Sequence, residues 1–131
     1  MYKKAIIIFL LLLPASFAFS QPMDCSRFRE GKFRIADTRA GAVIIADRRG
    51  GYQTESSETL KAVVRFRISW QDDCTYTLYL DKVIRNENKL DFPSNMQVHV
   101  KIVETTRNGY TQETSSSLTY GTYRVEVLKL D

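Results

Sequence analysis

The fold is decided by residues 62–80, which read AVVRFRISWQDDCTYTLYL. Apolar and polar side chains alternate through 62–71, and this period of two indicates a β-strand with one buried face. Asp72 and Asp73 then predict a tight turn, and the alternation resumes at Cys74 in a second strand. This stretch therefore predicts a β-hairpin.

Similar alternation recurs on both sides of this hairpin. Further strands are expected at residues 31–37, 42–48, 52–56, 96–102, 110–116 and 119–130. Asn108-Gly109 predicts a two-residue turn with positive φ, and a longer loop is expected at 85–89, closing near Pro93. About eight antiparallel strands without a helix favour an all-β, up-and-down meander that closes into a barrel, and a two-sheet β-sandwich is the alternative.

The N-terminal segment has the order of a secretory signal peptide. Two lysines precede an apolar run at 5–13, and small residues follow it. The run is about nine residues long, whereas a membrane-spanning helix needs about twenty, so no transmembrane anchor is expected. Cleavage is expected after Ala18 or Ser20, and Ser20 is preferred. Residues 1–20 are then the signal peptide and 21–131 a single β domain.

The cysteine count predicts a disulfide. Exported chains meet oxidising conditions, and two cysteines allow one internal pairing, Cys25 with Cys74. Closing the loop of about fifty residues between them contributes about 4 kcal/mol to stability in the chain-entropy model. Two buried free thiols are the alternative. A lipid anchor at Cys25 is a further alternative that fits less well, because Asp24 precedes the cysteine. The expected location is periplasmic or secreted.

The charge of the chain does not point to a nucleic-acid partner. The net charge is +4, of which Lys3 and Lys4 in the expected signal contribute two, so the exported part is close to neutral. No long run of one charge is present. A nucleic-acid surface is therefore not indicated.

A set of residues along the exported part carries a resemblance to a known family. The set comprises Cys25, Phe28, Gly31, Lys32, Phe33, Ile45, Arg48, Gln53, Glu55, Trp70, Asp73, Cys74 and Tyr76. It resembles a family of small exported bacterial proteins, many of them lipoproteins, with no established activity. The resemblance implies a lipocalin-like strand order, and Gly31-Lys32-Phe33 resembles the glycine-aromatic start of lipocalins. Relatives sometimes carry a DNA topoisomerase IV label, which a short, exported and nearly neutral chain does not support.

The sequence contains few residues suited to catalysis. It has no Gly-rich phosphate loop, no His-Glu-x-x-His, no Cys-x-x-Cys and no Gly-x-Ser-x-Gly. The single histidine, His99, is expected on the polar side of its strand. Asp72 and Asp73 fit a turn better than an acid/base pair, and no loop collects the six to eight oxygens that calcium prefers. No enzyme activity, metal or cofactor is expected.

Arg48, Gln53 and Glu55 are the most suggestive polar residues. They lie on adjoining predicted strands around the Gly50-Gly51 turn. An Arg-Glu pair that fixes this hairpin is the structural interpretation. The alternative is that the three side chains lie in the barrel mouth and orient a ligand.

The aromatic residues Phe66, Trp70, Tyr76 and Phe33 are expected to fill the barrel interior. An eight-strand barrel is wide enough for side chains or for one small ligand, and a packed core is favoured over a cavity. The alternative is a ligand cavity, which would be bordered by Val64, Phe66, Trp70, Tyr76 and Val100.

Arg65, Arg67 and Lys101, with Lys32 and Arg34, are candidates for a basic stripe on the outer face. Such a stripe would contact an anionic glycan or lipid headgroup, although an ordinary solvated face is the simpler interpretation. The leading hypothesis is a non-catalytic cell-envelope protein that binds a small apolar ligand or a partner surface. The alternative is a structural or interaction protein that acts through this basic face or a sheet edge.

Overall fold

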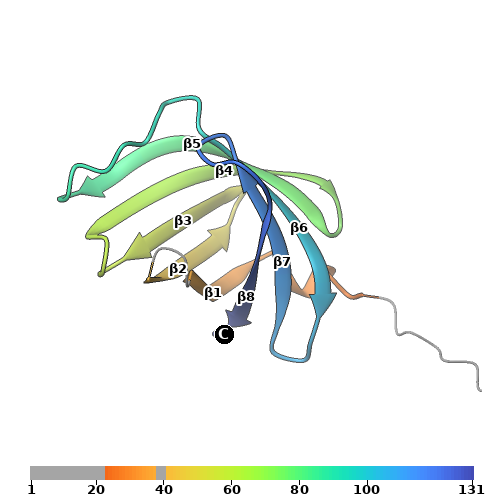
Figure 1. The fold of residues 1–131 in the computed structure, drawn as a ribbon. Coiled ribbons are helices and arrows are strands. Elements are labelled where there is room, and N and C mark those ends of the chain that lie inside the picture. Colours follow the sequence, from red (N-terminus) through yellow and green to blue (C-terminus); the bar gives the residue numbers. More distant parts are fainter. Residues whose placement is uncertain (1–22, 38–40) are drawn as a thin grey trace, which may run out of the picture.

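The chain forms a closed antiparallel β-barrel. The computed structural model describes residues 23–37 and 41–131, so the predicted signal peptide lies outside the described residues. Eight strands follow one another around the barrel in sequence order, and β1 pairs with β8 to close it (Figure 1). The predicted up-and-down meander barrel is confirmed, and the sandwich alternative is excluded.

The strand bounds follow the alternating pattern closely. They are β1 Gly31–Asp37, β2 Ala42–Arg49, β3 Tyr52–Ser57, β4 Ala62–Asp72, β5 Thr75–Asn86, β6 Gln97–Thr105, β7 Gly109–Ser116 and β8 Tyr123–Lys129. A short 3₁₀ turn, η1 (Ser26–Phe28), precedes β1. Two of the expected strand boundaries were wrong. Cys74 lies in the β4–β5 turn, and β5 continues to Asn86 into the expected loop.

Two glycine-containing turns differ from each other in their physical basis. Gly50 and Gly51 join β2 to β3 with φ of 59° and 81°, a conformation that glycine adopts readily. Gly109 instead lies in β7 and has no positive φ, so the turn type predicted for Asn108-Gly109 was wrong. Glycine is needed at 109 because a Cβ there would collide with the carbonyl oxygen of Val127 on β8.

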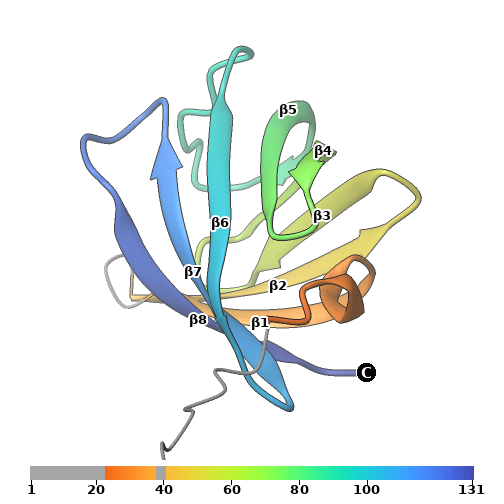
Figure 2. The ribbon, with the colours of Figure 1, turned by 90° about the vertical axis from the view of Figure 1, so that its right-hand side faces the viewer.

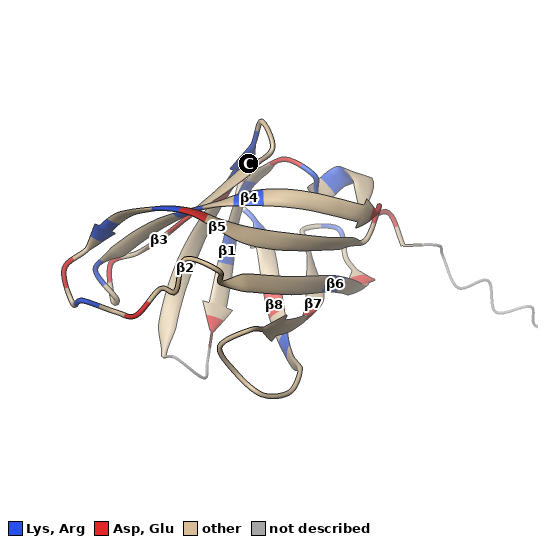
Figure 3. Ribbon diagram, turned by 90° about the horizontal axis from the view of Figure 1, so that it is seen from above, with Lys and Arg blue, Asp and Glu red and all other residues tan. Residues whose placement is uncertain are grey.

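Basic and acidic residues are interspersed along the ribbon (Figure 3). Arg65 pairs with Asp81 at 2.6 Å. Arg67 lies two residues after Arg65, also on the outer face of β4. Lys101 lies two strands away on β6, opposite Glu113 of β7. Arg65, Arg67 and Lys101 therefore do not form one continuous basic stripe, because acidic partners and the intervening strand β5 separate them.

The two ends of the barrel are built differently. The turns that follow β2, β4 and β6 lie at one end of the barrel, together with η1. We call this the closed end, and Figure 2 views the barrel from it. The connections after β3, β5 and β7 lie at the opposite, open end. Aromatic side chains gather at the closed end, where the ring of Phe28 lies 6.4 Å from that of Phe33 and 5.0 Å from that of Tyr110. The closed end is therefore packed by residues from η1, β1 and β7.

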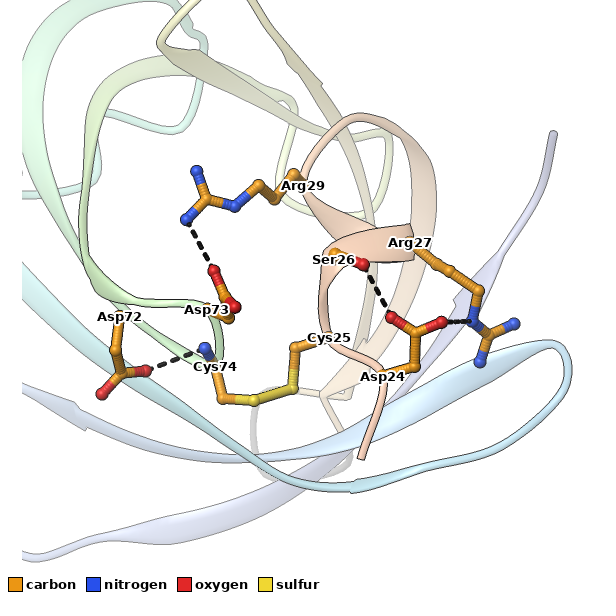
Figure 4. The surroundings of a disulfide bond; sticks show 8 residues. All are labelled: Asp24, Cys25, Ser26, Arg27, Arg29, Asp72, Asp73 and Cys74. Atoms are coloured by element: carbon orange, nitrogen blue, oxygen red, sulfur yellow. Dashed lines mark hydrogen bonds and ion pairs between the residues drawn. A yellow bond between two sulfur atoms is a disulfide. The ribbon is translucent and has the colours of Figure 1, made fainter. Parts of the chain in front are cut away.

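A disulfide holds η1 against the barrel. Cys25 and Cys74 are bonded, with 5.3 Å between their Cα atoms, and they join the residue before η1 to the β4–β5 turn (Figure 4). Beside the bridge, Asp72 accepts a hydrogen bond from the Cys74 amide, and Arg29 pairs with Asp73 at 3.3 Å. The predicted pairing is confirmed, and the two aspartates stabilise the turn.

The disulfide bears on location. Disulfides persist in oxidising compartments and are rare in the cytosol, so this bond indicates a non-cytoplasmic location. Because the Cys25 sulfur is bonded to Cys74, it is not available as a lipid anchor in this structure. Within 23–37 and 41–131, no helix has the length and apolar character needed to span a membrane.

Candidate binding cavity

Arg48 is the largest fully buried side chain, with 1% of its surface exposed. It lies near the closed end of β2. Its Nε donates to Oε1 of Gln53 at 2.8 Å, and Nη1 donates to the carbonyl oxygen of Phe28. Its Nη2 donates to the hydroxyl oxygens of Tyr76 at 2.9 Å and Tyr110 at 3.0 Å. One guanidinium thus links β2 to β3, η1, β5 and β7.

Aromatic rings surround the same guanidinium. Its central carbon lies 4.5 Å from the ring centre of Phe33 and 4.8 Å from that of Tyr76, so the π-faces favour the positive charge. Burial alone would lower the pKa of Arg48, but Tyr76, Tyr110 and Glu55 outweigh burial and raise this pKa above its ordinary value. The group therefore remains charged. Burial also raises the pKa of the Tyr76 hydroxyl well above its ordinary value. Arg48 therefore supports the closed end as a fixed buried cation.

Glu55 lies one inward position further along β3, toward the open end. Gln53 connects it to Arg48, because the Gln53 amide accepts from Arg48 and donates to Oε1 of Glu55 at 3.3 Å. Burial raises the pKa of Glu55 from 4.5 to about 7, although Gln53 and Arg48 oppose this shift. The carboxyl is half-buried, and it lines an interior cavity.

The cavity occupies the barrel interior above Arg48, toward the open end. Its volume is about 420 Å³, within the range of roughly 300–1,000 Å³ typical of small-molecule sites. The walls are mainly apolar and include Val64, Phe66, Leu78, Val98, Val100 and Val125. Leu60, Phe92, Met96 and Leu118 line it from the open-end connections and their flanks. The space is therefore suited to an apolar guest.

Gln112 brings a second amide to this cavity. It lies on β7 with 5% of its surface exposed, and its Nε2 donates to the hydroxyl of Thr114 at 3.0 Å. Its Oε1 is a buried oxygen with no hydrogen-bond partner among the described residues. The sequence analysis missed Gln112. The available signal was the alternation of Tyr110, Gln112, Thr114 and Ser116, which places polar side chains on the inward face of this strand.

The structure brings together most of the residues that the sequence singled out. Val64, Phe66, Tyr76 and Val100 border the cavity as the ligand alternative predicted. Trp70 does not. It packs 4.7 Å from the ring of Tyr76 near the closed end, with Arg29 stacked over it at 4.8 Å.

The preference for a packed core over a cavity was wrong. Phe33, Trp70 and Tyr76 pack around Arg48 at the closed end. Phe66 lines the cavity, and the rest of the interior stays open.

Arg48, Gln53 and Glu55 are linked by hydrogen bonds, but not as either interpretation expected. Arg48 lies below the cavity at the closed end instead of in the mouth, and it contacts Glu55 through Gln53 instead of directly. Gln53 and Glu55 do line the cavity. The hydrogen-bonded chain therefore runs from the closed end to the cavity.

Other candidate chemistry lies away from the cavity. His99 is exposed on the outer face of β6, as predicted, with its Nδ1 3.0 Å from the Thr77 hydroxyl. No three His, Cys, Asp or Glu side chains of the described ranges gather where they could hold a metal ion.

Comparison of the chain with protein-family models, curated proteins and solved structures gives no match.

Proposed function

We propose that this chain is a non-catalytic exported protein that binds one small, mostly apolar ligand inside its barrel. The observation that carries the proposal is the apolar interior cavity of about 420 Å³. Protein interiors are normally packed to the density of organic crystals, so a void of this size lowers stability unless something occupies it. Retaining such a void is understandable if the protein binds a guest there.

The division of the barrel into two ends supports this proposal. The closed end is held by Arg48, the packed aromatic rings and the disulfide. Rigid support of this kind keeps a binding site in its bound shape and so reduces the ordering cost of association. The open end has the longer connections, including the one between β5 and β6 that carries Phe92 and Met96. Ligand entry is expected there.

The alternative of a basic contact surface has less support. Arg65 is paired with Asp81, and the rings of Tyr52 and Tyr79 lie under Arg65 and Arg67, at 5.0 and 4.6 Å. The ion pair offsets the charge of Arg65, and the rings hold both side chains against the sheet, so the face presents less free positive charge to an anionic partner.

Binding of diphenylhexatriene tests the proposal, because this fluorescent hydrocarbon has no hydrogen-bonding group. We expect saturable binding to the disulfide-bonded protein with one site per chain. Val100→Trp places an indole in the cavity and is expected to weaken binding at least tenfold. Val43→Trp is the matched control, since Val43 is 39% exposed on β2, and it should bind the probe like the unmodified chain.

Thermal melting of both variants shows whether the barrel still folds. The proposal is contradicted if the probe does not bind, or if the two folded tryptophan variants bind it equally well.

A further inference from the structure

We propose that the ligand is a neutral amphiphile whose head carries a hydroxyl or amide N–H group, and that this head lies at the cavity floor beside Glu55 and donates a hydrogen bond to Oε1 of Gln112. This inference rests on the proposed function and specifies the chemical class of the ligand. It assigns the apolar part of the ligand to the upper cavity, toward the open end.

The unpartnered oxygen of Gln112 is the first argument. A buried polar atom without a hydrogen bond is costly, and most such atoms in native structures have a partner. Oε1 of Gln112 has none among residues 23–37 and 41–131, while its Nε2 is used by Thr114. A ligand that supplies one donor at this point satisfies the oxygen. A pure hydrocarbon would leave it unsatisfied.

The positions of Glu55 and Gln112 are the second argument. Gln53 and Tyr110 both bind the guanidinium of Arg48, and Glu55 and Gln112 lie two residues further along β3 and β7, respectively, toward the open end. Both therefore form the layer directly above Arg48. The strands β3 and β7 stand four places apart in the ring of eight, so the two side chains approach the cavity from opposite walls. A head group between them can contact both.

The charge of the floor is the third argument, and it favours a neutral head. Arg48 uses four of its five N–H donors on Gln53, Phe28 and the two tyrosines, and it does not line the cavity, so it does not offer an anion site there. An anionic head would instead meet the Glu55 carboxyl. Glu55 would attract a cationic head, but the fixed charge of Arg48 would repel that head, and the head would lose its hydration inside the barrel.

The apolar walls above this layer give the head a defined direction. Leu78 and Val98 line the cavity on β5 and β6, and Phe92 and Met96 line it from the connection between these strands. These residues offer no charged group to a ligand. An amphiphile therefore enters with its head first and leaves its chain along β5 and β6.

Displacement of diphenylhexatriene by 1-decanol, decanoate and decylamine tests the inference, because the three differ only in the head. At pH 8 we expect decanol to displace the probe at concentrations about tenfold lower than either charged compound. Gln112→Leu should weaken decanol several-fold and leave probe binding unchanged. Gln71→Leu, an exposed site on β4, is the matched control and should change neither.

Two further measurements separate a ligand contact from a structural role. Gln112→Leu removes a buried unsatisfied oxygen and also the bond to Thr114, so the two effects offset, and it should change the melting temperature of the free protein little while it weakens decanol. Glu55→Gln keeps the size of the side chain and removes its charge, so it should bring decanoate closer to decanol.

Each outcome is decisive. Probe binding with equal displacement by all three compounds, or preference for a charged head, overturns the inference and leaves the proposed function standing. Decanol selectivity that survives both Gln112→Leu and Glu55→Gln also overturns it. Absence of probe binding overturns the proposed function itself.

Discussion

Arg48→Met should destabilise the protein strongly, because it removes the cation that links the strands of the closed end. Methionine has a similar length but no hydrogen-bond donor. The substitution deletes the bonds donated to Gln53, Phe28, Tyr76 and Tyr110. The surrounding rings can still pack against the apolar replacement, so the main effect comes from the acceptors that lose their donor.

The size of the effect follows from those acceptors. The two tyrosine hydroxyls both bind Nη2 of Arg48, so once the guanidinium is gone they can bond each other. The Phe28 carbonyl and Oε1 of Gln53 lose theirs, and each unsatisfied buried acceptor costs about 1–3 kcal/mol. The expected loss in unfolding free energy is therefore about 4 kcal/mol, from two acceptors at about 2 kcal/mol each. This is a large share of a typical stability of about 5–15 kcal/mol.

Urea denaturation followed by the fluorescence of Trp70 measures this loss, since Trp70 lies near the closed end and is 5.8 Å from the guanidinium. Arg67→Met is the matched control. Arg67 is exposed on β4 and its guanidinium lies over the ring of Tyr79, so its substitution should change the unfolding free energy by less than about 1 kcal/mol. A loss below about 1 kcal/mol for Arg48→Met would refute the reasoning.

Two other perturbations test the disulfide and the cavity carboxyl. Replacing Cys25 and Cys74 with serine opens a loop with a sequence separation of 49 residues and should lower the unfolding free energy by about 4 kcal/mol, measured by urea denaturation; an unchanged midpoint would count against a stabilising bridge. Burial raises the pKa of Glu55 from 4.5 to about 7, so between these pH values the folded chain holds a proton that the unfolded chain has released. The unfolding free energy should therefore fall as pH rises across this window, and Glu55→Gln should show a smaller fall; identical pH profiles for the two proteins would contradict the role given to burial.

The strands were predictable because one face of each is buried. The inward positions of β4, from Ala62 through Val64 and Phe66, alternate with less buried positions, and a period of two identifies such a strand without tertiary information. The extension of β5 was not predictable in this way. Residues 82–85 are mostly exposed, so burial imposes no alternation there, and the β4–β5 pairing contains register shifts that break the period further.

The cavity was harder to foresee than the barrel. Strand patterns show which side chains point inward, but they do not show how far along the barrel axis each one packs. The packing at the closed end depends on η1 and on Arg48, which lie far apart from Tyr76 and Tyr110 in the sequence. The polar residues Arg48, Gln53 and Glu55 could be noticed from the sequence, but their order from the closed end into the cavity required the three-dimensional register.

Crystallography of the protein with diphenylhexatriene tests the central claim most directly. The account predicts electron density for one probe molecule inside the barrel, in contact with Val64, Leu78 and Val98 and above the layer of Arg48. Density for the probe only on the outer surface, or an interior filled by the protein's own side chains, would contradict the claim that this barrel encloses a binding site.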